Sequence, residues 1–170
     1  SLIKLSKDDL ETLICFTIKC SDDQTIFLLK LFIELVRPES STLDIIKENG
    51  YLFFNIHSIL KRSNFEIFFL LIDLIYELHN QEIINSISIQ QHLDVILKKY
   101  ISYKYLNEDI IMGLIERINN GKVELLPIAC FVAMNMEDDY ISTLFSDVQP
   151  HYLSIVPRFW VITLASIAPP

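Results

Sequence analysis

The chain has 170 residues, a length that predicts a single domain covering residues 1–170. Hydrophobic residues make up 51% of the chain and charged residues 21%, which excludes the disordered and low-complexity classes. The net charge of −8 disfavours binding to nucleic acid or to anionic lipid, because both carry the same sign of charge. The longest uncharged runs, Leu125–Met136 and Phe159–Pro170, are too short to span a bilayer, so we expect no membrane span.

Helix signals follow one another along the whole chain. Only 3 glycines and 6 prolines are present, too few for the turns of a many-stranded β fold. Ser21 with Gln24, and Ser63 with Glu66, have the form of a capping box at a helix N-terminus. Apolar residues then recur every three or four positions until a proline, glycine or asparagine ends each run. The predicted helices cover residues 7–19, 21–36, 42–48, 51–61, 64–79, 89–104, 107–119, 126–136, 139–146 and 151–166.

The chain also resembles itself at a nearly constant interval. At an offset of 42 residues, segment 21–36 matches segment 63–78, and at an offset of 43, segment 64–75 matches segment 107–118. Besides the apolar residues, the polar residues at the helix starts and the acidic residues also match between these segments. A unit of this length buries its apolar face only by stacking on its neighbours. The sequence therefore predicts an all-α, right-handed solenoid of about three to four degenerate repeats, with a compact, non-repeating all-α bundle as the alternative.

The order of helices resembles that of armadillo-like (armadillo/HEAT) repeat proteins. The short helix 42–48, the turn at Gly50 and the longer helices 51–61 and 64–79 are similar to the three-helix unit of that family. The resemblance implies an armadillo-like α-solenoid whose successive units line a groove.

One further motif of that family concerns binding. Segment 126–135 is similar to its third-helix pattern, an aromatic residue with Asn four positions later, here Phe131 and Asn135. Tyr51 and Asn55 have the same spacing. In the family, such pairs form a ladder in which Asn bonds the backbone of an extended peptide and the aromatic ring packs on its side chains. The resemblance thus implies that Phe131 and Asn135 contact a partner.

Catalytic and metal-binding patterns are missing from the sequence. The 4 histidines and 3 cysteines are scattered, without the spacing of a metal site or of a disulfide framework. We therefore expect no metal, no cofactor and no enzymatic activity. Free cysteines also suggest a reducing compartment, so we expect an intracellular protein of the cytoplasm or nucleus. Asp73 and Glu77, four apart on one predicted helix, keep an all-α enzyme with a buried acidic site open as an alternative.

A basic and aromatic patch at the end of helix 89–104 opposes the sign of the whole chain. It could hold an acidic peptide or stack on single-stranded nucleic acid, while lysines at a helix C-terminus also have a purely structural use. The patch consists of Lys98, Lys99, Tyr100, Tyr103 and Lys104.

Together these patterns predict a non-catalytic protein–protein interaction scaffold that binds a peptide or helix of a partner in a groove. We expect it to be part of a larger protein or complex. Segment 159–168 is almost wholly apolar, which points to further repeats or to self-association at that end, or to a helix that folds back on the core. A nucleic-acid-binding helical repeat is the remaining alternative, and the acidic net charge makes it the less favoured one.

Overall fold

A computed structural model of the chain describes residues 5–53, 56, 64–83, 89, 93, 107–136 and 139–153. Every regular element in these ranges is a helix and none of their residues lies in a strand, which confirms the all-α class. No helix within the same ranges is long and apolar enough to cross a membrane. The chain divides into two compact units, Ser1–Ile89 and Gln90–Pro170, and the predicted single domain stays a prediction.

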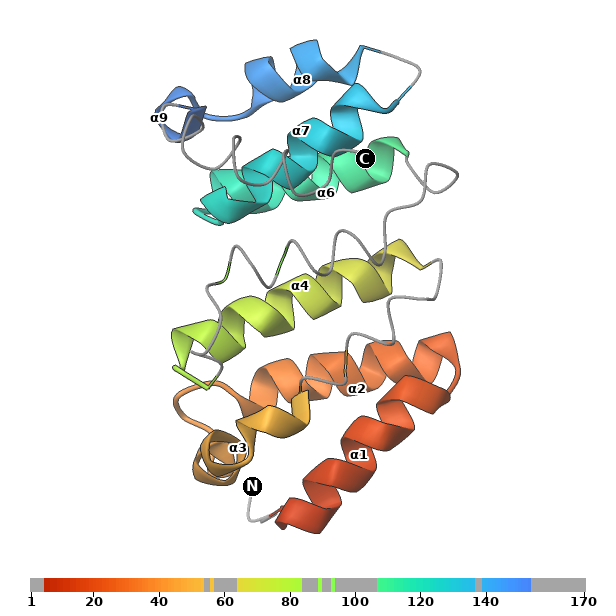
Figure 1. Cartoon of the computed structure of the whole chain (residues 1–170), viewed down its shortest axis with the longest axis vertical. Coiled ribbons are helices and arrows are strands. Elements are labelled where there is room, and N and C mark those ends of the chain that lie inside the picture. Colours follow the sequence, from red (N-terminus) through yellow and green to blue (C-terminus); the bar gives the residue numbers. More distant parts are fainter. Residues whose placement is uncertain are drawn as a thin grey trace, which may run out of the picture. The chain divides into compact units, whose positions relative to one another are not determined.

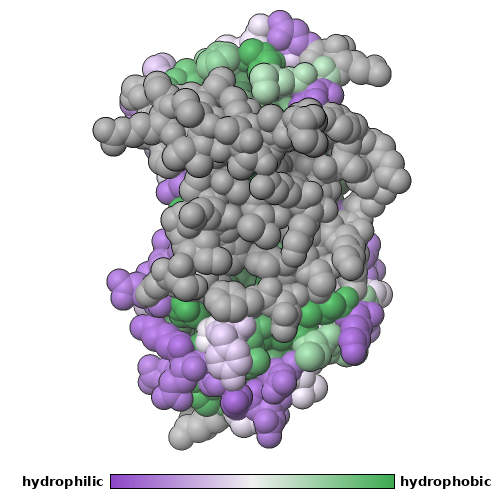
Figure 2. All heavy atoms as spheres, in the orientation of Figure 1, coloured by the Kyte–Doolittle hydropathy of each residue, from purple (hydrophilic) through white to green (hydrophobic). Residues whose placement is uncertain are grey.

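The first unit is built around a pair of packed helices. Its described helices are α1 (Lys7–Lys19), α2 (Asp22–Leu35), α3 (Leu43–Glu48) and α4 (Phe65–Asn80), shown in Figure 1. Helix α2 packs against α4, and α1 contacts α2. Helices α1 and α2 meet at the Cys20–Ser21 connection and diverge from it. On the face in view in Figure 2, hydrophilic residues of this unit border apolar ones.

The helix starts show which capping predictions hold. The Ser21 hydroxyl accepts a hydrogen bond from the backbone N–H of Gln24, and the Gln24 side chain accepts one from the Ser21 N–H, so this capping box is confirmed. The box predicted at Ser63 is wrong. The N-cap of α4 is Asn64, whose side-chain oxygen accepts from the N–H groups of Glu66 and Ile67 at 3.0 and 3.2 Å. An asparagine amide caps a helix as well as a serine hydroxyl does.

The observed caps recur at one interval. Ser21, Asn64 and Asn107 cap three helices at a constant spacing of 43 residues. In this register, four positions are buried in all three helices. They are Thr25, Phe68 and Ile111; Leu28, Leu71 and Leu114; Leu29, Ile72 and Ile115; and Phe32, Ile75 and Ile118. The self-similarity of the sequence therefore corresponds to a shared pattern of capping and burial.

The core of the first unit includes an aromatic pair between α2 and the turn that follows α3. The ring of Phe32 meets that of Phe53 edge to face, with centroids 5.6 Å apart. Residues 50–53 form a 3-10 turn where the sequence predicts a helix from residue 51. A Cβ atom on Gly50 would lie 2.6 Å from the Ile83 side chain and 2.8 Å from its carbonyl oxygen, so only glycine fits here without a shift of Ile83. The rest of helix 51–61, apart from Ile56, lies outside the described residues.

The second unit surrounds one strongly apolar helix. It contains α6 (Glu108–Asn119), a 3-10 turn η3 (Val123–Leu125), α7 (Leu126–Met134), α8 (Tyr140–Asp147) and α9 (Pro150–Leu153). Helix α7 packs against α6 and α8. Seven of its nine residues are buried, which is typical of a helix covered on all faces. Helices 107–119, 126–136 and 139–146 are confirmed with small shifts at their ends, whereas most of 89–104 and of 151–166 lies outside the described residues.

One side chain ties the end of α6 to the end of α8. The amide nitrogen of Asn119 donates to the carbonyl oxygen of Asp147 at 2.9 Å, and its amide oxygen accepts from the N–H of Gln149, also at 2.9 Å. An amide side chain thus supplies one donor and one acceptor to a loop, as a paired peptide group would. The connection after α8 is held by these two bonds.

Candidate functional site

The predicted basic patch falls on residues that the structure does not describe. Lys98, Lys99, Tyr100, Tyr103 and Lys104 all lie outside the described ranges. The patch therefore stays a prediction, and the candidate site has to be built from other residues.

The Phe131–Asn135 pair lies at the C-terminus of α7. The side-chain nitrogen of Asn135 donates to the carbonyl oxygen of Phe131 at 2.8 Å, and both residues are half-buried. The side chain that the family resemblance assigns to a bound peptide therefore uses one of its amide N–H groups to bond the backbone of its own helix here. Whether the pair also contacts a partner stays a prediction.

Tyr51 of the second aromatic–Asn pair lies on the surface of the first unit. Its ring is half exposed, and the ammonium nitrogen of Lys7 lies 5.8 Å from the ring centroid. A hydrogen bond with Tyr51 raises the pKa of Lys7 above its ordinary value. Tyr51 thus already has a cationic neighbour, and its predicted companion Asn55 lies outside the described residues.

Two kinds of reactive group can be checked among the described residues, a metal cluster and a buried thiol. Among them, no cluster of three or more His, Cys, Asp or Glu side chains could hold a metal ion. Burial raises the pKa of the Cys130 thiol to about 12, so this group stays protonated and unreactive at neutral pH. The alternative of an enzyme with a buried acidic site gains no support from these residues.

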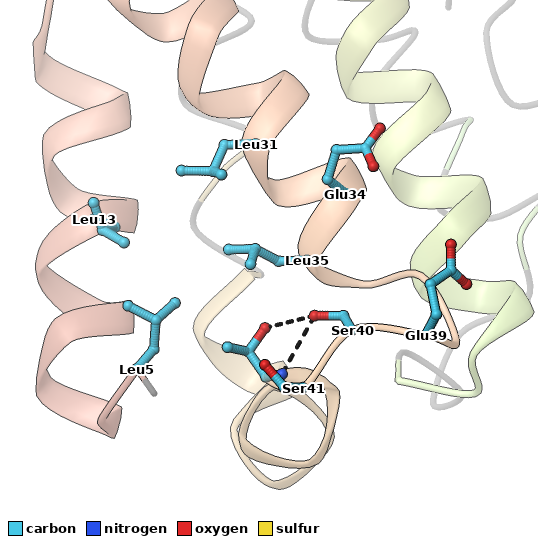
Figure 3. A pocket seen from close by; sticks show the side chains of 9 residues that line it. Leu5, Leu13, Leu31, Glu34, Leu35, Glu39, Ser40 and Ser41 are labelled. Atoms are coloured by element: carbon cyan, nitrogen blue, oxygen red, sulfur yellow. Dashed lines mark hydrogen bonds between the residues drawn. The ribbon is translucent and has the colours of Figure 1, made fainter. Parts of the chain in front are cut away.

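A cleft lies between α1 and α2 in the first unit. Its cavity has a volume of about 370 Å³ and is lined by residues of both helices and of the loop that follows α2. Figure 3 shows that Leu5 and Leu13 on the α1 side face Leu31 and Leu35 of α2. We call this hollow the leucine cleft, and its remaining lining residues are Glu34, Glu39, Ser40, Ser41 and Thr42.

Hydrogen bonds order both ends of the leucine cleft. Near the connection of α1 and α2, the Thr25 hydroxyl donates to the carbonyl oxygen of Thr17 at 2.9 Å, and both threonines are fully buried. The loop at the open end has bonds of its own, since the Ser40 and Thr42 hydroxyls lie 2.8 Å apart and the Thr42 N–H donates to Ser40 (Figure 3). The leucine cleft therefore lies between the hydrogen-bonded end of the helix pair and an ordered loop.

The rim of the leucine cleft is acidic. It contains Glu34 and Glu39, and no described lysine or arginine belongs to its lining. Arg37 pairs with Glu34, with 3.1 Å between guanidinium nitrogen and carboxylate oxygen. This pair is solvent-exposed on both sides, so it contributes little to stability, typically about 0–1 kcal/mol. The leucine cleft thus combines an apolar interior with a rim that attracts cations.

A second hollow lies at the closed end of the same helix pair. It has a volume of about 380 Å³ and is flanked by two exposed rings, Phe16 at 51% exposure and Phe27 at 68%. We call it the phenylalanine hollow, and the rest of its lining consists of Asp23, Gln24 and Leu28. Exposed aromatic rings beside a carboxylate are suited to binding side chains that have both apolar and cationic parts.

Sequence reasoning did not identify either hollow. The available signal was the second apolar face of α2, where Phe27, Leu31 and Leu35 follow one another at helical spacing. In the sequence, such an additional apolar face is equally consistent with stacking between repeats. The cleft depends on the divergence of α1 from α2, which no local pattern encodes.

No protein-family model, no curated protein and no solved structure matches the chain.

Proposed function

We propose that the protein is a non-catalytic protein–protein interaction scaffold whose leucine cleft binds a peptide or helix of a partner. The observation that carries this proposal is the cleft itself, an open hollow of about 370 Å³ lined by four leucines that are only half-buried. Apolar side chains left in contact with water at an ordered concave surface gain free energy when a partner covers them. Apolar anchors that enter such pockets usually provide most of the energy of an interface.

We further propose that the fold is a right-handed, armadillo-like α-solenoid and that the chain acts inside the cell as part of a larger protein or complex. Three helices capped at intervals of 43 residues, with four buried positions in common, support a repeated building block. The packing of α2 against α4 supports stacking of the first two copies. Free, partly exposed Cys15 and Cys20 support a reducing compartment.

A peptide-display selection tests the proposed function. The full chain is the bait, and the Leu35→Glu variant, which places a carboxylate inside the leucine cleft, is the counter-bait. Ile33→Glu is the matched control, because Ile33 is a half-buried residue of the same helix outside the cleft lining. We expect enriched peptides with apolar anchors that bind the wild type and the Ile33→Glu variant alike and bind the Leu35→Glu variant at least about tenfold more weakly.

Two outcomes would contradict the proposal. One is a selection that enriches nothing above the bait-free background. The other is a set of peptides that bind the Leu35→Glu variant as tightly as the wild type, since their binding site would then lie elsewhere. Circular dichroism and unfolding curves of the variants establish that any loss of binding comes from the cleft and not from loss of fold.

A further inference from the structure

The two hollows lie on the same side of α2. At about 100° of rotation per residue, Gln24, Phe27, Leu28, Leu31 and Leu35 fall within a sector of about 100°. The first three line the phenylalanine hollow and the last two line the leucine cleft. On α1, Leu13 and Phe16 are one turn apart and line one hollow each. The hollows are therefore successive parts of one surface between the two helices.

We infer that these hollows form a single groove, the α1–α2 groove, and that its occupant is a basic amphipathic helix of a partner protein. This inference rests on the proposed function and names the partner's chemistry. From Gln24 to Leu35, α2 rises about 16 Å, which is three helical turns. An occupying helix of the same length would present apolar side chains at positions i, i+3 or i+4, i+7 and i+11.

The charged residues of the groove favour an occupant that carries positive charge. Among the residues that the structure describes, the lining of the groove includes the carboxylates of Asp23, Glu34 and Glu39 and no cationic side chain. In the described part of the chain, Glu34 is paired with Arg37, and no ion pair involves Asp23 or Glu39. Asp23 lies at one end of the groove and Glu39 at the other, so lysines or arginines at both ends of a bound helix would find an opposite charge.

The same charges disfavour two other occupants. A second copy of this chain carries a net charge of −8, and a strand of nucleic acid carries one negative charge per phosphate. Each would bring like charge to an acidic rim, which costs free energy in the encounter and in the complex. A basic helix alone matches both the apolar floor and the acidic ends.

Peptide binding to the full chain, measured by fluorescence anisotropy at about 0.1 M salt, tests the inference. The probe is a peptide of about 18 residues with four leucines at the stated spacing and lysines on the flanking positions. Its partner peptide has every lysine replaced by glutamate. We expect the basic peptide to bind and the acidic one to bind at least about tenfold more weakly. The double variant Asp23→Lys/Glu39→Lys should reverse this preference.

Continuity of the groove is tested at its two ends with the same basic peptide. Phe27→Ser and Leu35→Glu change opposite ends, and each should weaken binding about tenfold. Phe65→Ser is the matched control, since Phe65 is another exposed phenylalanine and lines neither hollow. Unfolding curves of all variants are recorded alongside.

The outcomes separate the inference from the proposed function. Equal binding of the basic and acidic peptides, no binding of the basic peptide, or binding unaffected by Phe27→Ser would overturn the inference. In each of these cases the display selection with the Leu35→Glu counter-bait still decides whether the leucine cleft is an interaction site. A dimer in sedimentation experiments that Phe27→Ser disrupts would assign the groove to a second copy and also overturn the inference.

Discussion

Helices α4 and α6 begin in the same way and are buried very differently. Each is capped by an asparagine, Asn64 or Asn107, whose side-chain oxygen accepts from a backbone N–H of the first turn. Helix α4 is then buried on almost every face, whereas α6 buries one face and exposes Glu108, Asp109, Met112 and Glu116. A common capping device therefore sets where a helix starts, and the share of its surface that is buried sets how apolar it has to be.

Their ends differ as well. The residue after α4 that turns the chain into the left-handed region is Glu82, with φ of 58°, whereas the corresponding residue after α6 is Gly121, with φ of 100°. In both cases the next N–H bonds a carbonyl five residues back, from Ile83 to Leu78 and from Lys122 to Arg117. The same turn is thus made after α6 with glycine, which suits the left-handed region, and after α4 with glutamate, which is strained there.

Replacement of one core leucine in each helix by alanine should have the largest effect on stability. Leu71 and Leu114 occupy the same position after their caps, and both are fully buried. We expect Leu71→Ala and Leu114→Ala to lower the free energy of unfolding by about 2–5 kcal/mol each, because the removed atoms leave a cavity. The loss should be greater for Leu71, whose helix is enclosed on more sides. Chemical denaturation followed by circular dichroism measures both.

The exposed Met112 of α6 serves as the control, and Met112→Ala should change stability by no more than about 0.5 kcal/mol. A Leu114→Ala variant less stable than Leu71→Ala would show that enclosure of the whole helix does not determine the cost of a cavity.

Removal of the caps should have an intermediate and nearly equal effect. Asn64→Ala and Asn107→Ala each leave backbone N–H groups at a helix start without their acceptor. We expect each to cost about 1 kcal/mol, and the serine variants at both positions to recover most of it. Thermal unfolding of the two pairs measures the effect. A markedly larger loss at one cap would contradict the view that both helices share one starting device.

Substitution of the residues at the two helix ends should have effects no larger than those of the caps, with opposite signs. Glu82→Gly relieves the left-handed strain and should stabilise the protein by about 0.5–1 kcal/mol. Gly121→Ala introduces the same strain and should destabilise it by about 1 kcal/mol, although nothing lies within 4 Å of the added Cβ. The midpoints of urea unfolding measure the two shifts, and equal signs would rule out strain as the cause.

Local sequence signals are sufficient to place helices α1, α2, α3, α4, α6, α7 and α8, but not their exact starts. The hydroxyl of Ser21 and the amides of Asn64 and Asn107 are all good caps, and the sequence contains both Ser63 and Asn64 at one start. Because α4 is apolar nearly all round, it matches α2 almost equally well at offsets of 42 and 43. Only the observed cap at Asn64 fixes the interval at 43.

The candidate site could not be predicted from sequence patterns, for a related reason. Phe27, Leu31 and Leu35 look the same in the sequence whether a neighbouring repeat, a partner or water covers them. Their exposure follows from the angle at which α1 leaves α2, which depends on tertiary packing and on the Thr17–Thr25 bond near the connection. Phe131 and Asn135 show the converse, since a spacing typical of binding also fits a side chain that caps its own helix.

The bridge made by Asn119 has a consequence for how the chain can vary. Its two partners are main-chain groups of Asp147 and Gln149, so the side chains at 147 and 149 are free to differ between related proteins without breaking the bridge. Asn119 itself has no such freedom, because aspartate would lack the donor and leucine would lack both groups. Among any orthologues, invariance should therefore concentrate at 119 and substitutions should accumulate at 147 and 149.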